Sequence, residues 1–448
     1  MATNGEALRA SETRSPPRTP PPPPPQFRGG PLTVAEYMKE ALTNPHAGYY
    51  TTRGAVFGGG GDFVTAPDVS QLLGDCLAVW AVLEWRAAGA PPACRYVELG
   101  PGRGTLAADL LRAAAPVPGF ASSLSIHLVE VSPALRRAQW AALGCGAPGS
   151  GAPGPAPGEP EAGAAHLAGG APVAWHASLD TVPPSGPPTL YMAHEFVDAL
   201  PVHQFVRVAG RARAGGGGGG GARVRAPASP HPLLPTSTAW RERLIDTTAC
   251  GTRLRWVLAP GDTPATRALL PRRLAQLGPA AAALDALEIC PAGSALAADL
   301  AVRVAASGGS ALLVDYGRTS PPYADSLVAI ARHAGVDPLT APGAADLSAR
   351  VDFGGLADAV GGAGAAATAH GPISQASLLA GLGIAPRLQA LIEAAPDDAA
   401  AEALHSGAAR LVAPSADGGM GEAYLALAIA PSGRAAPVPF DGCGEGGG

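Results

Sequence analysis

Lysine is almost absent from the sequence, and aromatic and charged residues are few. Lys39 is the only lysine in 448 residues, and the other basic residues are arginines that form no basic run. The composition therefore gives no sign of a nucleic-acid-binding surface. Acidic residues exceed basic residues, 36 against 31, which gives a formal net charge of −5. This composition is typical of a biased genome, so residue counts alone carry little functional information.

Cysteine and long apolar runs are also scarce. The six cysteines contain no CxxC pair, which argues against a zinc site and a disulfide framework and favours a reducing compartment. They are Cys76, Cys94, Cys145, Cys250, Cys290 and Cys443. The longest apolar runs, such as residues 423–431, have the length of a strand, well short of the roughly 20 residues that cross a bilayer. We therefore expect neither a metal site nor a transmembrane segment.

Glycine and proline, by contrast, are abundant, at 60 and 48 residues. Together they fall just below the roughly 25–30% that is typical of disordered, low-complexity chains. They gather at the two ends and in two inserts. We therefore expect a disordered segment at 1–30, low-complexity inserts at 146–172 and 209–237, and a disordered tail at 431–448. The remainder of 31–430 is enough for one large domain.

The N-terminal segment has some features of a targeting peptide. It carries four arginines, but it also carries two glutamates, and the proline run at 20–25 cannot be helical. A transit peptide is arginine-rich, poor in acids and amphipathic. The residues alone therefore leave both targeting and cleavage open.

Strand-like and helix-like segments alternate along the chain. Apolar runs predict strands at 94–99, 125–131, 173–176, 189–193, 310–316 and 423–429, and helical spacing predicts helices at 71–88, 105–115, 133–144, 371–382 and 388–409. Three segments of period 2, at 203–208, 241–246 and 253–258, predict an antiparallel excursion, and a helical stretch follows over about 264–307. The alternation predicts an α/β fold with a doubly wound, mainly parallel sheet.

A glycine-rich turn, VELGPGRGT over 97–105, lies between the first predicted strand and the next helix. Gly100, Gly102 and Gly104 would let a ligand approach the backbone near a helix N-terminus. The turn also satisfies the dinucleotide pattern GxGxxG/A, and a purely structural tight turn is a further interpretation. Glu98 would repel a pyrophosphate, and Glu130, after the second strand, can bind ribose hydroxyls. S-adenosylmethionine, a sulfonium nucleoside, fits these two acids better than a dinucleotide does.

Two further motifs carry acids. In HEFVDALP, over 194–201, Asp198 replaces the second histidine of the zinc motif HExxH. Glu195 and Asp198 either hold a cationic substrate at the ligand-binding edge of the sheet or form an acid pair at a helix N-terminus. In GDFVTAPD, over 61–68, Asp62 belongs either to a turn that covers a cofactor or to a helix cap.

Several of these blocks occur together in one known family. The blocks are PLTVAEYMKEALTNPHAGYY, GDFVTAPDVSQLLG, YVELGPGRGTLAADLLR, HEFVDALPVHQF, ADLSARVDF, GPISQASLLAGLGI and GMGEAYLALAI. In this order, over about 31–430, the sequence resembles the MidA-type family of class I S-adenosylmethionine-dependent methyltransferases. These are mitochondrial protein-arginine methyltransferases that support assembly of respiratory complex I. The resemblance implies a Rossmann-like, seven-stranded α/β fold with a mixed α+β insertion at about 203–307.

The resemblance also implies roles for individual residues. Gly100, Gly102 and Gly104 fall on the loop that binds S-adenosylmethionine, and Glu130 falls on the acid that binds its ribose. Glu195 faces the substrate, and Asp62 keeps the acid of the GDF block. The implied partner is a complex I subunit, and the implied location is the mitochondrial matrix. The segment around 325–328 departs from the family's more basic version, in a region that the resemblance associates with partner recognition.

Methylation of arginine requires particular chemical groups in the active site. A guanidinium is always protonated and its nitrogens are poor nucleophiles. The reaction therefore requires a carboxylate that orients the group and a proton acceptor. We assign the orienting role to Glu195, with Asp198 and Asp62 as further acids. An assembly chaperone that keeps the pocket without turnover is an alternative, and a Rossmann dehydrogenase is a third interpretation.

The seven-glycine run at 215–221 supplies a first testable prediction. If the insert at 209–237 is dispensable, deleting Gly215 to Gly221 should leave the affinity for S-adenosylmethionine unchanged. Calorimetric titration of the deleted and full-length chains measures this directly. A large loss of affinity would contradict the assignment of this run to a low-complexity insert.

Overall fold

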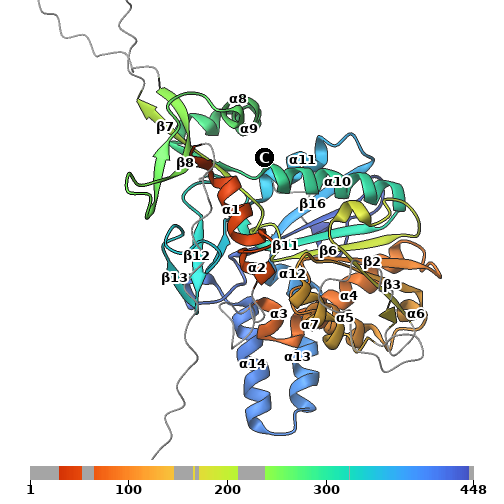
Figure 1. The fold of residues 1–448 in the computed structure, drawn as a ribbon. Helices are drawn as coiled ribbons and strands as arrows, with labels where there is room; N and C mark the ends of the chain where they lie inside the picture. Colours follow the sequence, from red (N-terminus) through yellow and green to blue (C-terminus); the bar gives the residue numbers. More distant parts are fainter. Residues whose placement is uncertain are drawn as a thin grey trace, which may run out of the picture.

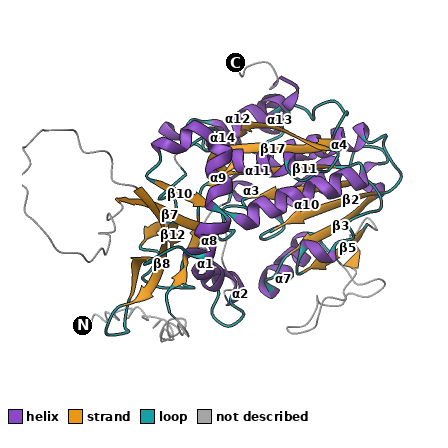
Figure 2. Cartoon of the chain, turned by 90° about the horizontal axis from the view of Figure 1, so that it is seen from above, coloured by secondary structure: helices purple, strands orange, loops and turns teal. Residues whose placement is uncertain are grey.

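The computed structural model describes residues 30–52, 65–145, 165–166, 171–209, 238–321 and 323–442. In this part of the chain, a large mixed sheet is covered by helices on both faces, and a smaller sheet lies to one side (Figures 1 and 2). The predicted α/β class is therefore confirmed. Most of the segments expected to be disordered, and the glycine run at 215–221, fall outside the described residues.

The large sheet has the strand order β16-β17-β11-β6-β2-β3-β5-β4, and β15 pairs with β11. Its strands are β2 (Cys94–Leu99), β3 (Leu124–Val129), β4 (Ala165–His166), β5 (Pro172–His176), β6 (Thr189–His194), β11 (Ser310–Arg318), β15 (Val351–Asp352), β16 (Ala367–Ser374) and β17 (Tyr424–Pro431). The central strands β5, β3, β2, β6 and β11 run parallel, and β17 is antiparallel to both of its neighbours.

The register of the central strands brings three loops together. Every residue of β2 and of β6 is buried, as expected for parallel strands covered on both faces. Leu99 at the end of β2 lies opposite Val129 of β3 and Ala193 of β6. The loops that begin at Gly100, Glu130 and Glu195 therefore leave the same edge of the sheet.

Helices form the two outer layers. One face of the sheet packs against a cluster that includes Trp80 and Leu110, and the other packs against a cluster that includes Leu300 and Phe353. The helices are α1 (Val34–Thr43), α2 (Tyr49–Thr52), α3 (Ala66–Val69), α4 (Gln71–Ala87), α5 (Thr105–Ala114), α6 (Phe120–Ser123), α7 (Pro133–Ala142), α8 (Pro264–Ala268), α9 (Leu270–Leu277), α10 (Pro291–Ser307), α11 (Phe353–Gly361), α12 (Gln375–Gly381), α13 (Ile384–Glu393) and α14 (Asp398–Val412). None of these described helices is long and apolar enough to cross a membrane.

The smaller sheet is built mainly from the segment between β6 and β11. It contains β1 (Leu32–Thr33), β7 (His203–Ala209), β8 (Thr238–Thr247), β9 (Leu254–Leu258) and β10 (Ala286–Ile289), and all of its pairs are antiparallel. The antiparallel excursion predicted from the sequence is therefore present. A third sheet joins β12 (Val328–Ala331), β13 (Ala334–Val336) and β14 (Asp346–Ser348).

Two segments differ from the predicted elements. The helical stretch expected over about 264–307 is interrupted by β10, which pairs with β7 in a register that places Leu287 opposite Phe205. The helix expected at 371–382 begins only at Gln375, because Ser374 caps α12 and the preceding residues extend β16. In both cases long-range strand pairing decides the backbone conformation.

The C-terminal segment also differs from expectation. Residues 431–442, which we expected to be part of a disordered tail, continue beyond β17 into a short 3-10 turn at Phe440–Gly442. The Phe440 side chain is buried in the same hydrophobic cluster as Trp80. This part of the tail therefore belongs to the folded core, while 443–448 lie outside the described residues.

Candidate active site

A cavity of about 400 Å³ lies at the edge of the sheet where β2, β3 and β6 end. The loops after these strands supply most of its wall, and α1, α2 and β14 close one side. The lining residues that the argument uses are Thr43, Tyr50, Leu99, Gly100, Gly102, Val129, Glu130, Leu135, Glu195, Phe196, Asp198 and Asp346. Five of the eight residues that we predicted for the site therefore line one cavity.

The glycine loop adopts a conformation that requires glycine. Gly100, Gly102 and Gly104 have φ angles of +62°, +54° and +84°, in the left-handed region that other residues rarely adopt. A Cβ atom on Gly100 would lie 2.6 Å from Cδ2 of Phe196. A Cβ atom on Gly104 would lie 3.1 Å from the Cα of Gln139. The loop is thus held tightly between α7 and the segment after β6.

Glu130, which follows β3, lines the large cavity and is held by hydrogen bonds. One carboxylate oxygen accepts hydrogen bonds from the backbone N–H of Ser132 at 2.8 Å, and the other accepts one from Gln139 Nε2 at 3.2 Å. Gln139 also donates to the carbonyl of Gly102 at 2.7 Å, which ties the acid to the glycine loop. Burial raises the pKa of Glu130 to about 7, although these hydrogen bonds oppose the shift.

Glu98 does not line this cavity. Its side chain points to the opposite face of β2, into a smaller cavity of about 50 Å³ that also contains His194. The Tyr96 hydroxyl donates to Glu98 at 2.9 Å, and burial raises the pKa of Glu98 to about 7. Glu98 therefore lies behind the glycine loop, in a cavity that Gly100 and Gly102 also line, because alternate residues of a strand face opposite sides.

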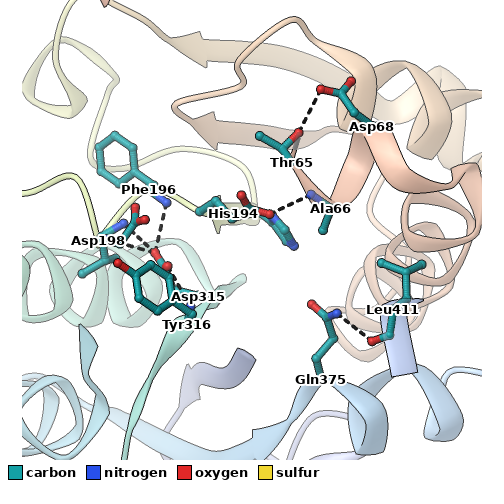
Figure 3. A network of polar contacts seen from close by, with 12 residues as sticks. Thr65, Ala66, Asp68, His194, Phe196, Asp198, Asp315, Tyr316, Gln375 and Leu411 are labelled. Carbon is teal, nitrogen blue, oxygen red and sulfur yellow. Dashed lines mark hydrogen bonds and ion pairs between the residues drawn. The ribbon is translucent and has the colours of Figure 1, made fainter. Parts of the chain in front are cut away.

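Glu195 begins the loop after β6 and has a φ angle of +50°, which is unusual for a residue with a side chain. Its carboxylate accepts a hydrogen bond from the backbone N–H of Ala66 at 2.8 Å (Figure 3). Burial, together with the negative charges of Asp315, Asp68 and Asp346, raises the pKa of Glu195 to about 8, although the hydrogen bond from Ala66 opposes the shift. A strained backbone and a raised pKa mark this residue as a functional candidate.

Asp315, within β11, fixes the loop that carries Glu195. One of its oxygens accepts hydrogen bonds from the backbone N–H groups of Phe196, Val197 and Asp198, at 2.9 to 3.2 Å (Figure 3). The sequence analysis missed this residue, although an acid at the end of the apolar run SALLVDY was a usable signal. Burial raises the pKa of Asp315 to about 7, because desolvation outweighs the hydrogen bonds that it accepts.

Asp346 in β14 is a second acid that the sequence analysis did not single out. It accepts a hydrogen bond from the Tyr50 hydroxyl at 2.7 Å and lines the large cavity together with Asp198. Burial, with the negative charges of Asp315, Asp346 and Glu195, raises the pKa of Asp198 well above its usual value. The end of the cavity beside Glu195 is therefore rich in acids. Asp62 lies outside the described residues, but its neighbours Thr65 and Ala66 border this region.

The buried acids predict how stability depends on pH. Glu98, Glu130 and Glu195 bind protons more tightly in the folded chain, so their contribution to stability is full at low pH and is lost as pH rises through about 7 to 8. Buried His127 and His194, with pKa lowered to about 4, oppose this trend only below about pH 6.5. We expect the melting temperature to fall by a few degrees between pH 6.5 and 8.5.

Thermal unfolding followed by circular dichroism at several pH values tests this prediction. The variant Glu98→Gln should show a shallower decline, because it removes one of the titrating carboxyls. A melting temperature that rises or stays constant over this range would contradict the raised pKa values.

The cavity fits a nucleoside with a positively charged sulfur. Three glycines leave the backbone open, Glu130 can accept hydrogen bonds from two ribose hydroxyls, and Leu99, Val129 and Leu135 give the cavity apolar walls. No group of three or more metal-binding side chains occurs among the described residues. The fold and the site together define a methyltransferase that uses S-adenosylmethionine.

Comparison with known proteins identifies the family. A family model described as "Putative S-adenosyl-L-methionine-dependent methyltransferase" matches residues 76–373. The chain belongs to this family, and S-adenosylmethionine is its cofactor, as the sequence resemblance implied.

Named relatives and a solved structure agree with this assignment. The chain is 37% identical over 413 residues to the mouse protein named "Protein arginine methyltransferase NDUFAF7, mitochondrial", with 90% of this chain and 82% of that protein covered. The human protein of the same name is 35% identical over 413 residues, with 90% and 81% covered. A Burkholderia thailandensis protein crystallised with S-adenosyl-homocysteine has a TM-score of 0.65 and 27% identity, with 90% and 88% covered. The expected mitochondrial location agrees with the names of these relatives.

Proposed function

We propose that this protein transfers a methyl group from S-adenosylmethionine to an arginine side chain of a mitochondrial protein. The observation that carries the proposal is the convergence of Glu195, Asp198 and Asp346 on the cavity that Gly100 and Glu130 also line. A guanidinium is a permanent cation with planar donors, and carboxylates bind it with paired hydrogen bonds. The names of the mouse and human relatives support the same substrate class.

The proposed mechanism assigns separate tasks to the two ends of the cavity. Gly100, Gly102 and Glu130 would hold the cofactor, which supplies an electrophilic methyl group when bound. Glu195 would orient the guanidinium and accept its proton, while Asp198 adds negative charge nearby. The backbone N–H of Ala66 and the loop fixed by Asp315 keep Glu195 in place. Positioning of this kind removes much of the entropic cost of the reaction.

The domain organisation supports the same proposal. The path β16-β17-β11-β6-β2-β3-β5 contains seven strands, and we assign it as the methyltransferase core. The segment between β6 and β11, about 203–307, is then the insertion. It lies beside α1, whose residues Leu42 and Thr43 also line the cavity, so this side of the molecule would receive the protein substrate.

We propose a complex I subunit as the substrate, on the strength of the family resemblance in the sequence. The test is transfer of a radiolabelled methyl group from S-adenosylmethionine to a mitochondrial extract, followed by mapping of the labelled residue. Label on an arginine of a complex I subunit is the expected result. If the purified protein binds S-adenosylmethionine but transfers no label, the chaperone alternative replaces this proposal.

A further inference from the structure

The small cavity behind the glycine loop has no role in the mechanism above. It shares Gly100, Gly102, Thr65 and Glu195 with the large cavity, so Glu195 stands in the wall between the two. Its polar and charged lining comes from α3, β2, the glycine loop, α5 and β6, and consists of Thr65, Asp68, Glu98, Arg103, Thr105, His194 and Glu195. A volume of about 50 Å³ with so many polar groups exceeds the roughly 10–15 Å³ that one water molecule requires.

His194 is the feature of this cavity that most needs an explanation. Its side chain is 3% exposed, and neither ring nitrogen has a hydrogen-bond partner within the described part of the chain. A neutral imidazole has one donor and one acceptor, and leaving either unpaired in a protein interior is costly. Its Nδ1 atom lies 3.7 Å from Oε1 of Glu195, so a small movement would bring these two atoms into hydrogen-bonding distance. Figure 3 shows the ring beside Ala66.

Further polar groups line the cavity that contains His194. Asp68 lines the same cavity and accepts hydrogen bonds from Thr65 at 3.2 Å and from Thr105 at 3.3 Å. Arg103 lies 3.8 Å from Asp68, and their side chains are 51% and 11% exposed. A proton that His194 releases into the cavity therefore has acceptors along the cavity wall, and the half-exposed Arg103 places one part of that wall at the protein surface.

We propose that His194 is a proton-relay residue that returns Glu195 to its ionised form after each methyl transfer. The inference rests on the proposed arginine methylation. A guanidinium nitrogen forms the new N–C bond, the S–C electron pair stays on sulfur, and the N–H proton goes to Glu195. His194 accepts this proton at one ring nitrogen and releases another from its second nitrogen to water in the small cavity, from which Asp68 and bulk solvent take it.

The surroundings suit His194 to this role. Burial lowers its pKa to about 4, so the ring is neutral at physiological pH and retains both an acceptor and a donor. The charged groups that line its cavity are Asp68, Glu98, Arg103 and Glu195. Because His194 acts on Glu195 rather than on the substrate, we class it as a positioning and relay residue, separate from the catalytic acid.

The test compares His194→Gln and His194→Ala with His370→Gln. His370 is a suitable control because its Nε2 atom is also buried without a partner, but it lies in β16, and it lines neither of the two cavities. We expect both His194 variants to lose about 100-fold in steady-state methyl transfer at pH 7, with S-adenosylmethionine affinity within about threefold. The methyl-transfer rates of the His194 variants should keep rising above pH 9, because hydroxide then removes the proton from Glu195. The rate of the unmodified protein should be constant in this range.

Two further measurements separate a relay from a structural role. Added imidazole should restore part of the activity of His194→Ala. Nitrogen-15 NMR of histidine side chains should show, besides the ring of His127, a second ring that stays neutral down to about pH 5 and is missing from His194→Gln. Unchanged rate and pH profile in His194→Gln would overturn the relay alone. A reduced rate with the original pH profile and no imidazole rescue would also overturn it. Absence of arginine methylation by the unmodified protein would overturn the proposed function and the relay together.

Discussion

Replacement of Glu195 by glutamine is expected to abolish methyl transfer while S-adenosylmethionine still binds with an affinity within severalfold. The amide keeps the size of the side chain but loses the negative charge that orients a guanidinium and the site that accepts its proton. Loss of such a group typically costs about 10²- to 10⁴-fold in rate. Glu195 lies at the acidic end of the cavity, at the start of the loop fixed by Asp315, and Glu130 and the glycine loop are unchanged by the substitution.

The control for this experiment is Glu288→Gln. Glu288 is also a buried acid, but it lies in β10 and accepts hydrogen bonds from Gln204 and Ser326, away from the cavity. Its substitution should leave the specific activity of the folded protein unchanged. Full activity of Glu195→Gln would remove this residue from the catalytic assignment, and Asp198 would be the next acid to test.

The second large effect is expected at the glycine loop, where Gly102→Val should weaken S-adenosylmethionine binding by about 100-fold or more. Gly102 has a φ angle of +54°, which a β-branched residue adopts only with strain. It lines the large cavity, and its carbonyl holds Gln139, which in turn holds Glu130. A valine would therefore intrude on the ligand and displace Glu130, the acid assigned to ribose binding.

Gly308→Val provides a matched control for backbone strain. Gly308 has a φ angle of +78° at the end of α10, and a Cβ atom there would have nothing within 4 Å. Both variants should lose stability, but only Gly102→Val should lose cofactor affinity. Calorimetric titration with S-adenosylmethionine, together with melting curves, distinguishes the two effects. Equal affinities in the two variants would show that Gly102 is needed for the fold rather than for binding.

The sequence predicted the elements that are mainly apolar. The strand at 94–99 matches β2 residue for residue, because a central parallel strand is buried on both faces, and four of its six residues, all but Arg95 and Glu98, are apolar. The same reasoning located β6, β11 and the loops that follow them to within a residue or two. The glycines of the cofactor loop were also predictable, since their spacing reflects a local turn.

Features that depend on distant partners were not predictable. β10 was missed because its pairing with β7 joins residues 80 or more positions apart, and β16 was missed because it is held by β17. The face of β2 on which the Glu98 side chain lies depends on how the strand is oriented in the sheet, and the sequence alone does not determine this orientation. Asp315 lies within β11 and Asp346 begins β14, and both acquire a role only because folding brings Asp315 against the loop after Glu195 and Asp346 into the cavity wall.

The contact between Phe196 and Gly100 has a consequence for the order in which ligands bind. The ring belongs to the loop proposed to face the protein substrate, and it packs so tightly against the glycine loop that no side chain fits between them. A ligand that shifts either loop must shift the other. Cofactor and protein substrate should therefore change each other's affinity by the same factor, as linkage requires. In steady-state kinetics with the concentrations of S-adenosylmethionine and protein substrate both varied, the apparent KM of each should then depend on the concentration of the other. Binding of the cofactor to the glycine loop would prepare the neighbouring loop that receives the arginine.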